Sequence, residues 1–279
     1  MKKKRKKRIN SLRLNKVVVL LFVFLAVIIS VLGFTIYKVL NKNTFKIESR
    51  SEMIEKSKKE DSDNYETVGW LRVQGTNMDM PILLSKNNSD SYPVEKDNYA
   101  WTMADDTKFH NVMNLMGHNI FNLSSQPDIN PDLTKSFESL MSFVYFDFAK
   151  ENKYIQLTID DKDYIYKIYS VDFIYATDVT RFTVLNYNNK DVVKEQLNMF
   201  KENTLFDYDV DVNENDKLLT LVTCTRFFGN QEQRKDFLVN ARLLRDGEKI
   251  KDYNIKKNDN YNKIENILRG DDENEEDSV

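Results

Sequence analysis

The stretch from Val17 to Tyr37 contains no charged side chain, and nine lysines and arginines lie in the 16 residues before it. As a helix rising about 1.5 Å per residue, these 21 residues reach roughly 31 Å, close to the thickness of the hydrocarbon core of a bilayer. We therefore predict a transmembrane anchor over residues 17–40 that contacts the lipid bilayer, preceded by a basic segment over residues 1–16.

The flanks of this stretch predict its orientation. A cleaved signal peptide usually has a shorter apolar region that ends in small residues, whereas a Phe-Thr-Ile-Tyr run follows Gly33. An uncleaved anchor is therefore favoured over a signal peptide. Because positive charges favour the cytoplasmic side, we expect a single-pass protein of the cell membrane, with residues 1–16 in the cytoplasm and the rest outside.

The charge of the chain is unevenly distributed. The formal net charge is −3, but the first 40 residues hold ten of the 41 lysines and arginines and none of the 44 aspartates and glutamates. The remainder therefore has 31 basic against 44 acidic residues. Such an acidic body argues against nucleic acid as a partner. The sequence also shows no glycine-rich phosphate-binding motif and no cluster with the spacing of metal ligands.

The chain after the anchor divides into three parts by composition. Residues 41–64 are polar with scattered apolar positions, which is typical of a partly helical stalk. Residues 65–250 contain the β-rich runs and predict the folded domain. Residues 251–279 are polar and end in an acidic run, which predicts a solvated C-terminal tail.

Short strands dominate the predicted domain. We expect strands at residues 67–73, 78–84, 99–101, 111–117, 154–159, 164–175, 217–225 and 237–244. Residues 160–163 predict a hairpin turn, and the helical spacing of apolar residues predicts a helix at 190–203, with a further short helix at 131–141. This pattern indicates a mostly β domain with inserted helices. Periodicity alone leaves both a barrel and a sandwich open.

Cys224, the only cysteine, ends the run Thr-Leu-Val-Thr-Cys. A free cysteine is often a small buried apolar residue, but a single thiol in a domain outside the cell is also typical of a reactive group. A nucleophilic thiol needs an imidazole beside it, and the chain has two histidines. His118 ends an apolar run after Gly117 and is the better candidate, because His110 lies in a polar stretch.

An oxyanion formed by attack on a carbonyl needs a hydrogen-bond donor, and arginine supplies a fork of donors that stays charged. Three arginines follow the cysteine within twenty positions, namely Arg226, Arg234 and Arg242. Arg226 and Arg242 can equally be surface residues that flank strands. The residues alone leave the choice among them open.

Several of these motifs together resemble the sortases, the membrane-anchored cysteine transpeptidases of Gram-positive bacteria. The run ending at Cys224 is similar to their TLxTC signature, and Leu115–Asn119 resembles the strand that carries their histidine. Residues 67–71 and 75–82 are similar to the first strands of the sortase domain. The resemblance covers residues 65–246, with the histidine before the cysteine and the arginine after it.

The resemblance implies a closed, roughly eight-stranded sortase-type β-barrel with inserted helices, in which Cys224, His118 and Arg234 meet. The predicted helix at 190–203 resembles the helical insertion of class B sortases, and Arg234 follows Cys224 at a similar spacing to theirs. Two departures stand out. Met116 replaces a tyrosine frequent in class B, and the segment from Arg234 to the last strand is about two residues longer than expected.

The resemblance also implies a reaction and its partners. Cys224 would attack the threonine carbonyl of a C-terminal sorting motif on a secreted protein, His118 would protonate the leaving amine, and Arg234 would stabilise the oxyanion. Thr223, Leu221 and Asn119 would contact the substrate, and an amine of a cell-wall precursor would resolve the thioester. No cofactor or metal is expected. The alternatives are a pilin-polymerising sortase and a catalytically inactive membrane-tethered binding module.

Overall fold

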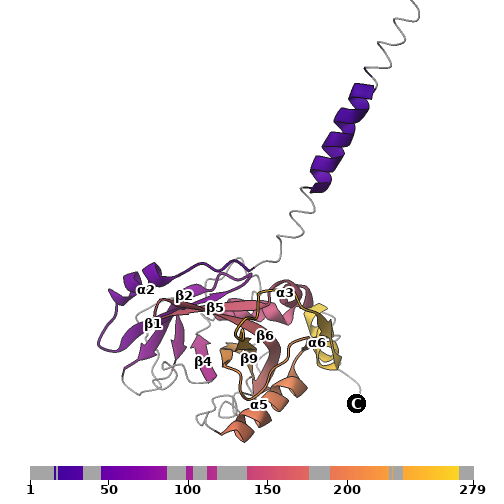
Figure 1. The fold of residues 1–279 in the computed structure, drawn as a ribbon. Coiled ribbons are helices and arrows are strands. Elements are labelled where there is room, and N and C mark those ends of the chain that lie inside the picture. Colours follow the sequence, from indigo (N-terminus) through magenta and orange to yellow (C-terminus); the bar gives the residue numbers. More distant parts are fainter. Residues whose placement is uncertain are drawn as a thin grey trace, which may run out of the picture. The chain divides into compact units, whose positions relative to one another are not determined.

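The computed structural model describes residues 16, 18–33, 45–86, 99–102, 112–117, 137–175, 189–225, 228 and 235–269 (Figure 1). The chain divides into two compact units, Met1–Thr44 and Phe45–Val279. In the first unit, residues 18–33 are helical and exposed. No helix in the described part of the chain is both long and apolar enough to cross a membrane. Residues 17 and 34–40 of the predicted anchor lie outside the described residues.

The second unit contains ten strands and five helices among its described residues. The strands are β1 (Tyr65–Val73), β2 (Asp79–Ser85), β3 (Ala100–Thr102), β4 (Val112–Gly117), β5 (Tyr154–Ile159), β6 (Lys162–Tyr175), β7 (Phe206–Tyr208), β8 (Leu218–Thr225), β9 (Lys235–Leu243) and β10 (Ile255–Lys257). The helices are α2 (Ser51–Lys58), the 3₁₀-helix η2 (Phe137–Val144), α3 (Phe146–Glu151), α5 (Lys190–Asn203) and α6 (Asp259–Arg269).

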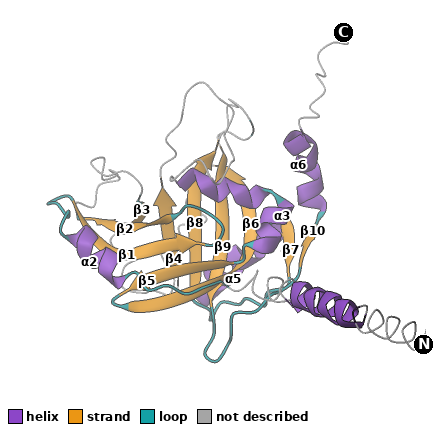
Figure 2. Cartoon of the chain, turned by 90° about the horizontal axis from the view of Figure 1, so that it is seen from above, coloured by secondary structure: helices purple, strands orange, loops and turns teal. Residues whose placement is uncertain are grey.

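Eight of the strands close into a barrel in the order β1-β2-β3-β4-β8-β9-β6-β5 (Figure 2). The pairs β2–β3 and β4–β8 are parallel, and the other neighbours are antiparallel. β7 and β10 form a separate two-stranded sheet. The barrel predicted for the domain is therefore confirmed. The sandwich is excluded because β1 pairs with β5 and closes the sheet on itself.

The hairpin between β5 and β6 shows how local sequence specifies part of this barrel. Asp160 and Asp161 adopt φ angles of 48° and 58°, the left-handed conformation that two-residue hairpin turns require and that aspartate tolerates. The ladder runs from Ile159 paired with Lys162 to Tyr154 paired with Lys167. The predicted hairpin is confirmed.

The helix α5 covers part of the outer surface of the barrel. Its buried residues Val193, Leu197 and Phe200 recur at helical spacing and pack in one cluster with Val222 and Leu238 of the sheet. At its start, the side chain of Asn189 accepts a hydrogen bond from the Asp191 backbone, which satisfies one free amide of the first turn. The structure gives this helix the bounds predicted for it.

The predicted stalk, residues 41–64, differs from the structure over its described part. Phe45 is 6% exposed and stacks on Tyr154, with ring centroids 6.2 Å apart. Ile54 of α2 is buried, and the hydroxyl groups of Ser57 and Thr67 are hydrogen-bonded at 3.0 Å. The partly helical character is confirmed by α2, but these residues pack against the barrel, because a few widely spaced apolar side chains are enough to attach the segment.

The predicted C-terminal tail, residues 251–279, also differs up to residue 269. β10 pairs with β7, and the hydroxyl of Tyr253 donates to the backbone oxygens of Lys153 and Ile168. Tyr261 and Ile264 of α6 are buried in the main core. These buried residues are not recognisable in the sequence, because polar residues dominate the segment and only one of its faces is apolar. Residues 270–279 lie outside the described part.

Candidate active site

The strand register brings together, at one end of the barrel, the strand ends that adjoin the predicted site residues. β4 and β8 run in parallel and pair Gly117 with Thr223, while β8 and β9 pair Cys224 with Asp236. His118 follows Gly117 directly in the chain, and Arg234 precedes the first residue of β9. His118, Asn119 and Arg234 themselves lie outside the described residues. The end of β8, which carries Cys224, thus lies beside the end of β4 and beside the start of β9. The chain continues from β4 to His118, and it reaches β9 from Arg234.

Gly117 fixes the end of β4. A Cβ atom at this position would lie 2.1 Å from Cγ of Phe137, which is far closer than atoms approach without a bond. Phe137 begins η2 and is 1% exposed, so it has little room to move. Only glycine allows β4 to lie against η2, and this packing determines where the chain leaves the strand towards His118.

The end of β8 has an outer and an inner face because successive residues of a strand alternate sides. Val222 packs under α5 with Leu238 on the outer face, whereas Leu221 belongs to the main core with Val239. Val222, two positions before Cys224, thus lies on the outer face of this strand end.

The two predicted substrate contacts on β8 lie on the other face. Leu221 is fully buried in the main core, and Thr223 is 1% exposed and pairs with Gly117 and Phe237. Both side chains are therefore buried on the inner face in this structure, and their contact with a substrate stays a prediction. Leu221 and Thr223 pack beneath the end of β8 and support the strand there. The sequence does not predict their burial, because the TLxTC run does not show which face of the strand is covered.

A row of polar side chains crosses the outer face behind the nucleophile position. Thr220 donates to Oδ1 of Asn240 at 2.8 Å, and Nδ2 of Asn240 donates to Ser170 at 3.3 Å and to Asp172 at 3.2 Å. The hydroxyl of Ser170 also donates to Asp172 at 2.8 Å. Burial raises the pKa of Asp172 to about 7, although the Ser170 hydrogen bond opposes this shift. The row ties β8, β9 and β6 together under α5.

A lysine surrounded by aromatic rings lies at the start of β9. Nζ of Lys235 is 4.2 Å from the centroid of the Phe228 ring and 4.9 Å from that of Tyr175. Phe228 in turn meets Phe173 edge to face at 4.8 Å. Because Lys235 pairs with Thr225, the residue after the cysteine, this contact places a positive charge close to the end of the nucleophile strand. The sequence alone gave no sign of it.

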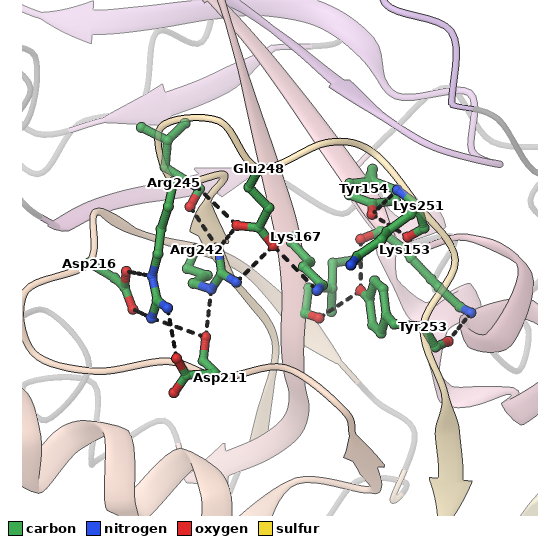
Figure 3. Close-up of polar contacts among 12 residues, drawn as sticks. Lys153, Tyr154, Lys167, Asp211, Asp216, Arg242, Arg245, Glu248, Lys251 and Tyr253 are labelled. Carbon is green, nitrogen blue, oxygen red and sulfur yellow. Dashed lines mark hydrogen bonds and ion pairs between the residues drawn. The ribbon is translucent and has the colours of Figure 1, made fainter.

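Arg242 lies at the opposite end of β8, where it pairs with Leu218. Figure 3 shows its contacts with Glu248. Its guanidinium is 3% exposed and donates to both oxygens of Glu248, at 2.6 and 3.0 Å. This bidentate pair lowers the pKa of Glu248 to about 2, although its partial burial acts in the opposite direction. Arg242 is therefore a structural residue and is removed from the three candidate arginines. Arg226 and Arg234 remain, both outside the described residues.

Comparison with known proteins decides the family. Residues 71–244, more than half of the chain, match the family model described as the sortase domain. The chain belongs to the sortase family. Sortases are cell-surface cysteine transpeptidases that act on substrate proteins, so this chain is an enzyme of that kind, and the resemblance stated from its motifs is confirmed.

The sortase is similar to class B members of the family. It is 21% identical to sortase B of Staphylococcus aureus (strain NCTC 8325 / PS 47) over 253 residues, which cover 84% of this chain and 99% of that protein. The X-ray structure of Clostridium perfringens sortase B matches with a TM-score of 0.55 at 24% identity and covers 68% of this chain and 100% of that one. A sortase B–substrate complex from S. aureus matches with a TM-score of 0.50 at 20% identity, over 76% and 91% of the two chains. At these identities the structural matches establish the barrel fold.

Proposed function

We propose that this sortase cleaves a C-terminal sorting motif of secreted proteins after threonine and transfers them to a cell-wall amine. One observation carries the assignment of its site. The register pairs Gly117 with Thr223 and Cys224 with Asp236. The end of β4 before His118, the end of β8 with Cys224 and the start of β9 after Arg234 therefore lie side by side. The match to the sortase domain supports a protein substrate, because sortases act on substrate proteins.

In the proposed reaction, the thiolate of Cys224 attacks the carbonyl carbon of the threonine. Arg234 donates hydrogen bonds to the oxyanion of the tetrahedral intermediate. The C–N bond then breaks, and His118 gives its proton to the leaving amine, which leaves a thioester on Cys224. The incoming amine attacks this thioester, His118 accepts a proton from it, and the Cys224 thiolate departs. Asn119, next to the histidine, is proposed to contact the substrate.

The location proposed for the enzyme is the cell membrane. The charge-free stretch within residues 17–40 acts as a single-pass anchor, with the basic residues 1–16 on the cytoplasmic side and the catalytic domain outside. An anchored position keeps the enzyme close to the site where secreted proteins leave the membrane. The anchor is inferred from the length of the apolar stretch and from its positive flank.

The test uses the full-length chain in detergent with a panel of threonine-containing sorting peptides. We expect cleavage after threonine, a thioester on Cys224 in the mass spectrum, and no activity in Cys224→Ala. Arg234→Ala should lose at least 100-fold in kcat, on the order seen when an oxyanion donor is removed, while Arg226→Ala retains most of it. Absence of both cleavage and the Cys224 adduct would exclude the enzymatic function.

The acceptor is identified in the same assay. Short glycine or diaminopimelate peptides represent the cell-wall amine, and a protein lysine represents the acceptor of a pilin-polymerising enzyme. Transfer to the cell-wall peptides at a higher kcat/KM supports the proposal. Preferential transfer to the lysine would assign the enzyme to pilus assembly instead.

A further inference from the structure

A buried carboxyl group on β6 lies close to the C-terminal end of α5. Asp172 is 2% exposed, and its Oδ2 accepts hydrogen bonds from the hydroxyl of Ser170 at 2.8 Å and from Nδ2 of Asn240 at 3.2 Å. The hydroxyl of Ser170 also lies 3.3 Å from the backbone oxygen of Phe200, near the end of α5. Ser170 is therefore placed between the carboxyl group and the helix.

Ser170 faces two acceptors with one hydrogen to donate. A hydroxyl group carries a single hydrogen and two lone pairs, so Ser170 cannot donate to Asp172 and to Phe200 at the same time. Its oxygen also accepts a hydrogen bond from Nδ2 of Asn240 at 3.3 Å. The amide of Asn240 is oriented by Thr220, whose hydroxyl donates to Oδ1 at 2.8 Å. These contacts leave the direction of the Ser170 hydrogen to be decided.

The charge of Asp172 decides that direction. An ionised carboxylate only accepts, so it takes the hydrogen of Ser170, and the oxygen of Phe200 keeps the backbone amide of Thr204, 3.0 Å away. A carboxyl group protonated on Oδ2 donates to Oγ of Ser170 instead, and the hydroxyl of Ser170 then donates to Phe200. One proton taken up by Asp172 thus moves a hydrogen bond from within β6 to the junction between β6 and α5.

The surroundings of Asp172 set the pH at which this happens. Burial raises the pKa of Asp172 to about 7, although the Ser170 hydrogen bond opposes this shift. The facing groups on β8 and β9 are the neutral Thr220 and Asn240. The side chains that α5 buries are also uncharged, namely Val193, Gln196, Leu197 and Phe200. Asp172 therefore changes its charge close to neutral pH.

Other ionisable groups near Asp172 keep their state over this range. Tyr169 of β6 and Tyr208 of β7 interact with its charge, and burial raises the pKa of both hydroxyls above the usual value. Asp216, before the start of β8, interacts with Tyr169. Burial opposes the ionisation of Asp216, but hydrogen bonds from Arg245 at 2.7 and 2.8 Å outweigh it and lower the pKa. Asp172 is thus the group of this cluster that titrates.

The helix at the other side of Ser170 covers strands of the candidate site. The cluster under α5 includes Val222 of β8, and Met116 of β4 packs against it. These two residues are paired in the β4–β8 ladder, one position before the pair of Gly117 with Thr223. A change in how firmly α5 is attached therefore acts on the strands next to the site.

We propose that Asp172, Ser170 and the backbone oxygen of Phe200 form a proton-dependent switch between β6 and α5. Protonation of Asp172 turns the hydroxyl of Ser170 to Phe200 and fastens the end of the helix to the sheet. Ionisation turns the hydroxyl back to Asp172 and removes that bond. The switch goes beyond the proposed reaction and holds whichever motif or acceptor the enzyme uses.

The test measures amide hydrogen exchange of the full-length chain in detergent from pH 5 to 8 by mass spectrometry. Each exchange rate is divided by the intrinsic rate at that pH, and the protection of residues 197–204 is expressed relative to that of β5, which reports on the fold as a whole. We expect this ratio to fall about 2- to 10-fold as the pH rises, because one hydrogen bond of the helix end is lost. A ratio that stays constant or rises would overturn the proposal.

Two variants separate the switch from a general effect of pH. Asp172→Asn removes the titrating group, so its ratio should not depend on pH. Ser170→Ala is the matched control, because it keeps the carboxyl group and lacks the hydroxyl that reaches Phe200. Its overall stability should still depend on pH, whereas its ratio should not. A ratio that falls with pH in Ser170→Ala as in the wild type would show that Ser170 does not transmit the effect, and the same result in Asp172→Asn would show that another group titrates. Either result would reject the switch.

Discussion

The two ends of the β8–β9 ladder hold their positive charges in different ways. At the Leu218 end, Arg242 binds both oxygens of Glu248, Arg245 binds both oxygens of Asp216, and Lys167 lies 3.5 Å from Glu248 (Figure 3). At the Cys224 end, the described cation is Lys235, whose ammonium group lies over two aromatic rings.

This difference has a physical meaning. A carboxylate neutralises the cation that it binds, whereas an aromatic ring holds a cation without cancelling its charge. The Leu218 end therefore stabilises the fold, because its buried charges are paired. The Cys224 end keeps a positive charge close to the strand that carries the nucleophile, and such a charge favours the thiolate.

The largest effect is expected at the paired end. Arg242→Met keeps most of the apolar stem but leaves Glu248, which is 19% exposed, without its bidentate partner, and the backbone oxygen of Asp211 with the longer hydrogen bond from Arg245 in place of the one from Arg242. Loss of one member of a buried pair costs about 3–5 kcal/mol. Thermal unfolding followed by tryptophan fluorescence should show a Tm lower by about 10 °C, with kcat unchanged below the transition. A comparable loss of kcat at low temperature would contradict the division between the two ends.

Gly117→Ala tests the Cys224 end of the barrel by adding a methyl group where β4 packs closely against η2. The added methyl group would lie 2.1 Å from Phe137 Cγ, and overpacking of this kind costs about 1–3 kcal/mol. Here we expect stability and kcat to fall together, because the displaced strand end leads to His118. The control is Gly117→Ala combined with Phe137→Leu, in which the smaller side chain should recover part of both losses. A loss of Tm with full kcat would show that the end of β4 does not position the site.

The sequence predicted the elements whose pattern is local. The β8 run, the β4 run and the helix α5 were all recognisable from short-range periodicity, and the turn at Asp160 and Asp161 from its composition. The attachment of Phe45 and of α6 was missed, since single apolar residues in polar segments dock on surfaces formed by distant parts of the chain.

The candidate site shows the same limit. The motif around Cys224 and the Gly-His pair indicated the chemistry. The acid opposite Cys224 and the exclusion of Arg242 depend on the pairing of β8 with β9, which no local pattern specifies. Likewise, the inner-face position of Leu221 follows from which side of the strand is covered.

Between the two ends lies Asp172, a buried carboxyl group whose described hydrogen-bond donors are the neutral Ser170 and Asn240. Its pKa is raised from 3.8 to about 7 in the folded protein, so the folded state binds a proton that the unfolded state has lost. Stability from this group should therefore fall as the pH rises from about 4 to 7, by at most about 1.4 kcal/mol per unit, and stay constant above. Asp172→Asn should remove this slope and raise stability by about 1–2 kcal/mol at pH 8. Unfolding measured from pH 4 to 8 checks this; a parallel slope in the variant would contradict it.

The smallest effect on stability is expected for Lys235→Met, which is the counterpart of Arg242→Met at the other end. Methionine keeps an apolar chain against Phe228 and Tyr175, and no carboxylate loses a described partner, so the cost should be about 0.5–1 kcal/mol. Removal of a positive charge near the nucleophile strand should move the pH midpoint of Cys224 alkylation by iodoacetamide to higher pH, whereas Arg242→Met should leave that midpoint in place. If the two variants moved the midpoint equally, the field at Cys224 would come from the net charge of the domain, and the difference between paired and ring-bound cations would not matter for the reaction.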